Sequence, residues 1–332
     1  SHADIRELTW VHVADSYELR SGIRKVFWGV TESQHLVDVI NQTDAVENPD
    51  GEEKLGQPMI NLSWLRSWGV VDIYWLMGFR ERNFSGRQGR PGFPFQIETD
   101  DAVYESRAGQ YRGDFAIRWV HSIGDLEFGL SHFSGTGREP TLVPRFTRAN
   151  GIPESVVLIP HYNIIEQTGI DSQYFLGDWT FKAEAISRGG QGIRYEAATV
   201  GFEKTLVGIA GSRGDLGLIA EYLYDGRGAS GPALGQDDIA LGVRYSFNDA
   251  AATTALLVTL IDRESHEYLT TLEASSRFGE RLKITIEASL VSNTRRVTPG
   301  LLGFLEVLSD PHADLAFLRN EDFIKLELIW YL

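Results

Sequence analysis

The chain has 332 residues, no cysteine and a formal net charge of -15 at pH 7. The absence of cysteine excludes disulfides, thiolate metal ligands and a thiol nucleophile. The acidic charge argues against a nucleic-acid partner, because phosphate contacts need a clustered basic surface. A helical membrane span needs about 18 to 20 apolar residues, whereas the longest uncharged stretch, Ala250 to Ile261, has twelve.

Apolar and polar residues alternate in many short stretches along the chain. Between positions 71 and 82, an extended chain would place two sets of residues on opposite faces. One face would carry Val71, Ile73, Trp75, Met77 and Phe79, and the other Asp72, Tyr74, Arg80 and Arg82. The same period of two recurs at 282–290 and at 323–332, and it predicts strands with one apolar face and one charged face. Fifteen strands are predicted in this way, at 5–14, 17–28, 58–67, 70–82, 114–122, 125–134, 164–176, 179–188, 194–207, 216–225, 238–247, 253–262, 268–278, 282–292 and 322–332.

The connections between these strands alternate between tight and long. The tight ones are 15–16, 68–69, 123–124, 177–178, 208–215, 248–252 and 279–281, and the longer ones are 29–57, 83–113, 135–163, 189–193, 226–237, 263–267 and 293–321. Tight periplasmic turns and longer extracellular loops are typical of an outer-membrane barrel. The sequence therefore predicts an all-β fold, a single transmembrane antiparallel up-and-down β-barrel spanning 1–332. A soluble barrel or sandwich stays open as the alternative, but it would need a second layer to cover the apolar face.

Strand parity suggests that this barrel is larger than the fifteen visible strands. If the last strand descends to the periplasm, strand 5–14 descends as well, whereas bacterial barrels begin with a rising strand and have an even strand number. We therefore expect one or more strands ahead of Ser1 and a total of sixteen or eighteen. No signal peptide stands at the start, which fits either a chain that is not exported or a mature or trimmed form.

Several stretches resemble a large family of porin-like outer-membrane proteins of proteobacteria, related in style to alginate-export-type barrels. They are Ile5–Trp10, Arg24–Ser33, Ile40–Asp44, Gly78–Arg82, Ala220–Asp225 and the closing strand. The resemblance implies further strands ahead of Ile5 but no particular substrate. Barrels of this kind usually end in Phe, whereas this chain ends in Leu332, which keeps the apolar character of the last position.

Alternation assigns a set of charged residues to the inward face of the barrel. These predicted pore-lining residues are Arg20, Arg24, Arg80, Arg82, Arg118, Glu184, Glu203 and Glu221, with Glu273 and Glu287 further round. The arginines gather in the first third of the wall, where they would attract anionic or polyhydroxylated solutes. Solvated lining and ion pairs within the wall are the alternative interpretation.

Loop 29–57 exceeds the length of a simple connection, and we expect it to fold inward as a constriction loop. A Thr-x-x-Gln capping box at Thr31 and Gln34 predicts a short helix with Leu36, Val39 and Ile40 on one face. The second half carries five carboxylates and no cation: Asp44, Glu47, Asp50, Glu52 and Glu53. They would face the arginines across the pore; an exposed acidic loop is the alternative. A calcium site fits less well, because the spacing matches no established calcium loop.

Loop 83–113 and the aromatic residues complete the predicted membrane protein. The loop combines Arg82, Arg87, Arg90, Arg107 and Arg112 with Phe93 and Phe95, a mixture suited to an acidic or sugar-like ligand or to simple packing in the barrel mouth. Outward aromatic residues suggest interfacial girdles. They are Trp28, Trp64, Trp75, Trp119, Trp179, Tyr222, Tyr245 and Trp330.

The function predicted from these features is a porin-like channel in the outer membrane of a Gram-negative bacterium. It would pass small anionic or polyhydroxylated solutes by diffusion or export. A barrel partner of an export machine or a structural barrel is the alternative, and a barrel hydrolase is less favoured because no Gly-x-Ser-x-Gly, His-Glu-x-x-His or phosphate-binding motif occurs. We expect no catalytic residue, metal or other cofactor. The expected partners are membrane lipid, lipopolysaccharide, the barrel-assembly machinery and small solutes, and oligomerisation stays open.

Overall fold

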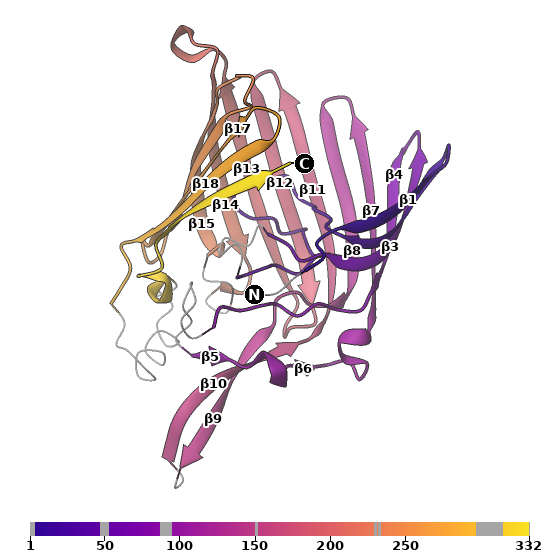
Figure 1. Ribbon diagram of the computed structural model, residues 1–332, viewed down its shortest axis with the longest axis vertical. Helices are drawn as coiled ribbons and strands as arrows, with labels where there is room; N and C mark the ends of the chain where they lie inside the picture. Colours follow the sequence, from indigo (N-terminus) through magenta and orange to yellow (C-terminus); the bar gives the residue numbers. More distant parts are fainter. Residues whose placement is uncertain are drawn as a thin grey trace. The chain divides into compact units, whose positions relative to one another are not determined.

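The computed structural model describes residues 4–46, 53–86, 95–149, 152–228, 231, 234–296 and 315–331. Fifteen strands form one antiparallel sheet in which sheet order follows chain order (Figure 1). They are β1 (Leu8–Val13), β2 (Tyr17–Arg24), β3 (Gln57–Arg66), β4 (Gly69–Met77), β7 (Gly113–Ile123), β8 (Leu126–Thr136), β11 (Ile164–Leu176), β12 (Trp179–Gly189), β13 (Tyr195–Leu206), β14 (Asp215–Asp225), β15 (Asp237–Ser246), β16 (Thr254–Asp262), β17 (Tyr268–Phe278), β18 (Leu282–Ser292) and β19 (Phe323–Trp330). The predicted all-β, up-and-down antiparallel architecture is confirmed, and every predicted strand has a counterpart. Among the described residues, no helix is long and apolar enough to span a membrane.

The two faces of the strands differ in exposure as the alternation predicts. On β4, Ile73 and Trp75 are each 45% exposed, whereas the intervening Tyr74 is 5% exposed. On β19, Leu326 and Leu328 are each 62% exposed. Cross-strand pairing keeps the apolar face continuous, because Ile73 pairs with Ile117 on β7 and Ile286 on β18 pairs with Leu326. A shift of one residue would invert every side chain, so the predicted register is confirmed on these strands.

Strand β4 is shorter than predicted, so Phe79, Arg80 and Arg82 lie beyond its end. The alternation suggested a strand to position 82, but β4 ends at Met77. Gly78 follows with φ of +76°, a left-handed conformation that breaks the extended backbone. Phe79 then turns into buried packing against Tyr104 and Tyr162, with ring centroids 6.0 and 4.8 Å away. The assignment of Arg80 and Arg82 to a strand of the wall is therefore wrong.

A second, smaller sheet lies in segments predicted as loops. Its strands are β5 (Gln96–Ile97), β6 (Val103–Tyr104), β9 (Thr141–Ala149) and β10 (Ile152–Tyr162). Strand β10 pairs antiparallel with β9 and parallel with both β5 and β6. The connections predicted at 83–113 and 135–163 therefore contain strands of their own. Short 3-10 turns complete the secondary structure at Thr99–Asp101, Gly109–Tyr111, Ile209–Gly211 and Ala316–Leu318.

The chain divides into two compact units. The first unit consists of Ser1–Val30, His35–Ser172 and Glu184–Glu196, and it contains the small sheet. The second unit consists of Thr31–Gln34, Gln173–Ala183 and Ala197–Leu332. Each unit includes part of the connection between β2 and β3, so each holds that connection by its own contacts.

Candidate functional site

The connection between β2 and β3 makes several polar contacts with the strands. We call residues 26–46 the anchored segment. In the first unit, its hydrogen-bond acceptor is Glu184 on β12, whose side chain is fully buried. The Glu184 carboxylate accepts hydrogen bonds from the backbone N–H of Val30 at 2.7 Å and of Val37 at 3.2 Å. Val37 itself is fully buried, so a strand carboxylate satisfies backbone donors that water cannot reach.

In the second unit, Glu221 on β14 performs the same role. Its carboxylate accepts hydrogen bonds from the backbone N–H of Glu32 at 2.7 Å and of Ser33 at 2.8 Å, and also from the Ser33 hydroxyl. Gly201 stands directly across from Glu221 on β13. A Cβ at Gly201 would lie 2.5 Å from Cγ of Glu221, so only glycine leaves room for this side chain.

The predicted helix at Thr31 is absent. Residues 30–40 form bends and turns, not a helix. In a capping box the N-cap hydroxyl accepts a hydrogen bond from a backbone N–H, whereas the Thr31 hydroxyl donates to the Gln34 carbonyl oxygen. The Val37 N–H, which a helix beginning after Thr31 would pair internally, is bound to Glu184 instead. The predicted helix is therefore wrong, and a side chain distant in sequence holds one of the backbone donors it would need.

Most of residues 36–42 of the anchored segment are buried, and further polar contacts hold this part. Asn41 accepts a hydrogen bond from Val26 N–H at 2.8 Å and donates to the Leu55 carbonyl oxygen at 2.9 Å. Asp38 lies 3.2 Å from the Lys54 ammonium group. Burial raises the pKa of Asp38, and the Lys54 charge opposes this shift.

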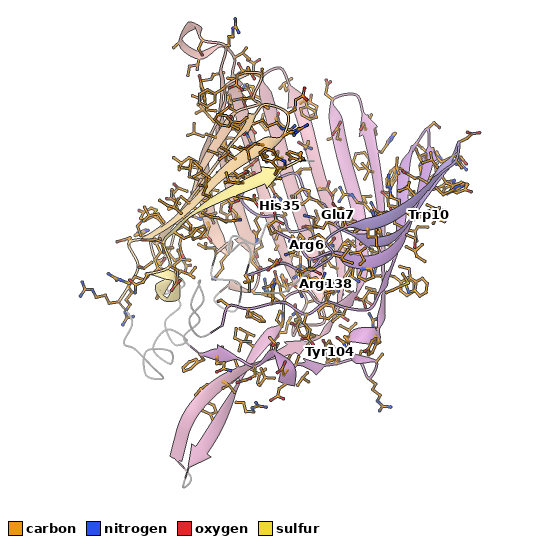
Figure 2. The ribbon with its side chains drawn as sticks, viewed as in Figure 1. Arg6, Glu7, Trp10, His35, Tyr104 and Arg138 are labelled. Carbon is orange, nitrogen blue, oxygen red and sulfur yellow. The ribbon has the colours of Figure 1, made fainter. Side chains whose placement is uncertain are left out.

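Arg138, between β8 and β9, holds the segment from another side. Its guanidinium donates to the Ile40 carbonyl oxygen at 3.0 Å and to the Asp114 carboxylate at 3.1 Å (Figure 2 labels Arg138). The rings of Phe79 and Phe133 each lie 5.2 Å from its guanidinium carbon. Burial lowers the pKa of Arg138, and the Asp114 carboxylate opposes this shift. Sequence patterning missed Arg138 because the residue lies outside any strand.

The acidic half of the predicted constriction loop is described only in part. Glu47, Asp50 and Glu52 lie outside the described residues. Asp44 is 1% exposed and forms an ion pair with Arg6 at 2.6 Å, and Asn83 donates to it at 2.5 Å. Glu53 lies 3.7 Å from the Lys25 ammonium group. Arg6 and Lys25 were not among the basic residues predicted to face this loop.

Three predicted pore-lining arginines lie on strands and have polar partners there. Arg20 forms an ion pair with Glu18 on the same strand, β2. Arg24 donates to the Asn61 side chain on β3 at 2.8 Å. Arg118 on β7 is 9% exposed and forms an ion pair with Asp171 on β11 at 2.7 Å. These contacts agree with the alternative that inward charges pair within the wall.

Arg80 and Arg82 lie after β4 and contact other parts of the first unit. Arg80 donates to the Gly56 carbonyl oxygen at 3.0 Å and forms an ion pair with Asp4 at 3.0 Å. The Arg82 guanidinium donates to the Gln42 side chain of the anchored segment at 3.4 Å. Arg82 is thus one of the predicted basic residues that the structure places against this segment.

Another predicted wall residue, Glu203 on β13, belongs to a four-charge group in the second unit. The other members, Glu32, Lys182 and Arg244, were not predicted as site residues. Lys182 lies 3.6 Å from Glu203 and 3.3 Å from Glu32. Arg244 on β15 lies 3.4 Å from Glu203 and 2.5 Å from Glu32. Alternation alone could have placed Lys182 and Arg244 on the inward face, since each follows the period of its strand.

The prediction of an outward-facing side chain is wrong for one aromatic residue. Trp28 follows the end of β2 and is 3% exposed, with its ring 5.2 Å from the Arg118 guanidinium carbon and 5.6 Å from the Tyr74 ring. The strand predicted to reach position 28 ends at Arg24, so alternation no longer determines where this side chain points. Trp64, Trp75, Tyr222 and Trp330 are exposed on strands, as predicted.

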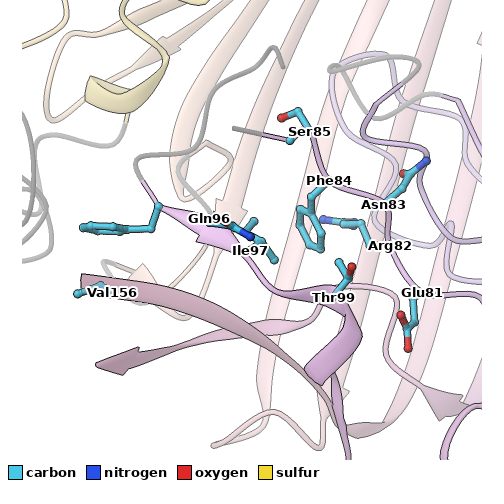
Figure 3. Close-up of a pocket in the computed structure, with 11 residues that line it drawn as sticks. Glu81, Arg82, Asn83, Phe84, Ser85, Gln96, Ile97, Thr99 and Val156 are labelled. Atoms are coloured by element: carbon cyan, nitrogen blue, oxygen red, sulfur yellow. The ribbon is translucent and has the colours of Figure 1, made fainter. Parts of the chain in front are cut away.

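A cavity of about 930 Å³ lies beside the small sheet in the first unit (Figure 3). Its lining includes the charged side chains of Glu81 and Arg82, the amides of Asn83 and Gln96, and the Phe84 ring. The Tyr104 hydroxyl donates to the Glu81 carboxylate at its edge. Burial raises the pKa of Tyr104, and this hydrogen bond adds to the shift. Such a lining offers both hydrogen-bond partners and a ring surface to a polar solute.

Comparison with known proteins yields similar structures but no family. Neither a protein-family model nor a curated protein matches the chain. One similar structure is Wzi, an outer membrane protein involved in group 1 capsule assembly in Escherichia coli and described as a carbohydrate-binding β-barrel, with a TM-score of 0.47, 12% identity, and coverage of 85% of this chain and 65% of that one. This chain thus spans less than two thirds of Wzi.

Two further similar structures have lower TM-scores. A porin gives a TM-score of 0.40 at 11% identity, with coverage of 84% of this chain and 88% of the porin. The outer-membrane expressed OmpT of Vibrio cholerae gives 0.40 at 10% identity, with coverage of 98% and 81%.

Proposed function

We propose that this protein is an outer-membrane channel of a Gram-negative bacterium that passes small anionic or polyhydroxylated solutes. The observation that carries the proposal is the contrast between the two faces of the sheet. One face exposes large apolar side chains, and the other holds buried charges and the anchored segment. A channel needs both surfaces, because lipid must cover the outside while water and solute occupy the inside.

The apolar face supports insertion into lipid. Exposed apolar residues occur on strand after strand of both units, including Phe115, Ile117, Val200, Leu218, Leu241, Leu257, Leu290 and Ile324. Leaving such surface in water costs on the order of 25 cal/mol per Å², and monomeric soluble proteins rarely expose patches larger than a few hundred Å². Hydrocarbon chains would cover this face, and a closed barrel would leave no strand edge unpaired in the membrane.

Aromatic residues near the short turns support a position of these turns at the membrane–water interface. In the first unit, the Trp119 indole donates to the Trp68 carbonyl oxygen at 3.0 Å. In the second unit, the Lys204 ammonium group lies 5.1 Å from the Trp179 ring centre. Amphipathic rings of this kind are typical of the membrane–water interface. We propose that the short turns face the periplasm, with membrane lipid, lipopolysaccharide and the barrel-assembly machinery as partners.

The anchored segment supports a narrowed channel. Buried carboxylates bind it in each unit, and it therefore occupies space on the charged face. Arg20, Arg24, Arg80 and Arg82 all lie in the first unit, and guanidinium groups along a solute path would favour anions. The cavity of Figure 3, with its amides and its ring, supports polyhydroxylated solutes as a further cargo.

Planar-bilayer recording tests the proposal directly. The wild-type protein should give discrete conductance steps with a preference for anions. Replacing Arg80→Gln and Arg82→Gln together should lower the anion preference, because two cations are removed. The control is Arg263→Gln, an exposed arginine paired with Asp237 outside the anchored segment. Absence of steps from correctly inserted protein would contradict the channel and favour a structural barrel or an export-machine partner.

A further inference from the structure

The four-charge group of the second unit combines three strand residues with one residue of the anchored segment. A purely structural cluster would not require a charge from outside the strands. Glu203, Lys182 and Arg244 belong to strands, whereas Glu32 belongs to the anchored segment. Both cations lie closer to Glu32 than to Glu203: Lys182 at 3.3 against 3.6 Å, and Arg244 at 2.5 against 3.4 Å. The carboxylate closest to both cations is therefore the one that does not belong to a strand.

The strands hold the other three charges in position. Gly217 on β14 pairs with Arg244 on β15 and with Thr205 on β13. A Cβ at Gly217 would lie 2.4 Å from a Glu203 carboxylate oxygen. Because glycine has no side chain, the Glu203 side chain can cross β14 toward Arg244 on β15. Lys182, Glu203 and Glu32 are only 11%, 16% and 17% exposed in their side chains. Charges of this kind are expensive to leave unpaired when partly buried.

We infer that Lys182 and Arg244 form a binding site for a carboxylate solute, and that Glu32 occupies this site as a tethered substitute. Without Glu32, the site holds two cations and one carboxylate, which is a net charge of +1. A single carboxylate restores neutrality, whereas a dianion would overshoot it. Glu32 demonstrates that a carboxylate fits between the two cations. The inference rests on the proposed channel for its biological meaning and assigns that channel a cargo class.

Displacement of the Glu32 side chain from the two cations is limited by the neighbouring contacts. The backbone N–H of Glu32 and the N–H and hydroxyl of Ser33 are bound to Glu221, so this anchor limits how far the Glu32 side chain can leave. A tethered group has a high effective concentration, which weakens the apparent affinity for a free competitor. The wild-type protein should therefore bind a simple carboxylate weakly, and removal of the tethered group should reveal the affinity of the site.

The test is a titration of the folded, detergent-solubilised protein with ¹³C-acetate at constant ionic strength in sodium chloride, followed by NMR line broadening. Glu32→Gln should lower the acetate dissociation constant at least about tenfold, because the competing carboxylate is lost. Ser33→Ala keeps all four charges but removes one contact with Glu221, and it should lower the constant by a smaller factor. The matched control is Glu280→Gln, the same substitution in the exposed turn between β17 and β18, which should behave as wild type.

Adding Lys182→Gln and Arg244→Gln to Glu32→Gln should abolish the gain. Equal acetate affinity of wild type and the Glu32→Gln variant would overturn the inference, as would full binding by the triple variant. Far-UV circular dichroism confirms that each variant is folded. Because binding is measured in detergent without any membrane potential or flux, a protein that binds acetate but shows no conductance contradicts the channel alone. A conducting protein without acetate binding contradicts this site alone.

Discussion

The connection between β2 and β3 and the β9–β10 hairpin satisfy their backbone hydrogen bonds in different ways. In the first, backbone N–H groups such as those of Val30 and Ser33 donate to the carboxylates of Glu184 and Glu221. In the second, the two strands pair with each other from Ala149 and Ile152 to Thr141 and His161, with one register shift between Pro153 and Ser155. The first connection depends on strand side chains, whereas the second provides its own partners. Single substitutions on the strands should therefore disturb the first far more than the second.

The largest effect should come from Glu184→Ala. This substitution leaves the half-buried Val30 N–H and the buried Val37 N–H without their acceptor. Each unsatisfied donor costs about 1 to 3 kcal/mol, so we expect a loss of about 3 kcal/mol in the free energy of unfolding, measured by urea titration in lipid bilayers. Glu196→Ala, an exposed glutamate of β13 in the same unit, is the control. A loss no larger than that of the control would show that the segment does not depend on Glu184.

Gly201→Ala should have the next largest effect. The new Cβ would lie 2.4 Å from the Ala220 carbonyl oxygen and 2.5 Å from Cγ of Glu221. Both the backbone of β14 and the Glu221 side chain must shift to admit the new Cβ, and we expect a loss of about 1 to 3 kcal/mol in the free energy of unfolding. The same titration measures it. Gly86→Ala, where a Cβ meets nothing within 4 Å, is the matched control. Equal stability of the two variants would contradict the close approach of Glu221.

Tyr162→Phe tests the hairpin region and should have a smaller effect. The Tyr162 hydroxyl accepts a hydrogen bond from the Arg82 N–H at 3.0 Å, while burial raises the pKa of Tyr162 to about 12. Loss of one such hydrogen bond costs about 1 kcal/mol. Tyr111→Phe, at an 82% exposed position, is the control and should be neutral. A loss as large as that of Glu184→Ala would mean that the two regions do not differ as described.

The smallest expected effect is a change in pH dependence on Asp38→Asn. The pKa of Asp38 is raised in the folded protein by burial, against the opposing Lys54 charge. The folded state thus binds this proton more tightly than the unfolded state, and the Asp38 contribution to stability falls as pH rises from the ordinary aspartate pKa near 3.8 through the raised folded pKa. The variant lacks this fall, so its stability relative to wild type should increase across that window. Thermal unfolding midpoints from pH 3 to 8 measure the difference, and a flat difference would refute the shift.

The sequence by itself determined the fifteen strands and the face that each residue takes within them. Alternation with period two is a local property, so neighbouring residues such as Ile73 and Tyr74 reveal their opposite faces without knowledge of the fold. The same reasoning assigned Glu184 and Glu221 to the inward face. It failed at strand ends: Gly78 stops β4 by its left-handed backbone, and beyond Arg24 no alternation controls Trp28.

Only the tertiary structure decided the small sheet and the path of the anchored segment. Pro144, Pro153 and Pro160 argue against strands because proline lacks an N–H donor. The fold accommodates them because β9 is paired only with β10, and β5 and β6 pair with β10 over two residues each. The anchored segment carries a helix signal at Thr31, yet the Glu184 carboxylate, 147 residues away in sequence, binds the Val37 N–H that a helix would pair internally. Such long-range competition for hydrogen bonds leaves no trace in local periodicity, because it depends on which side chains the folded strands bring together.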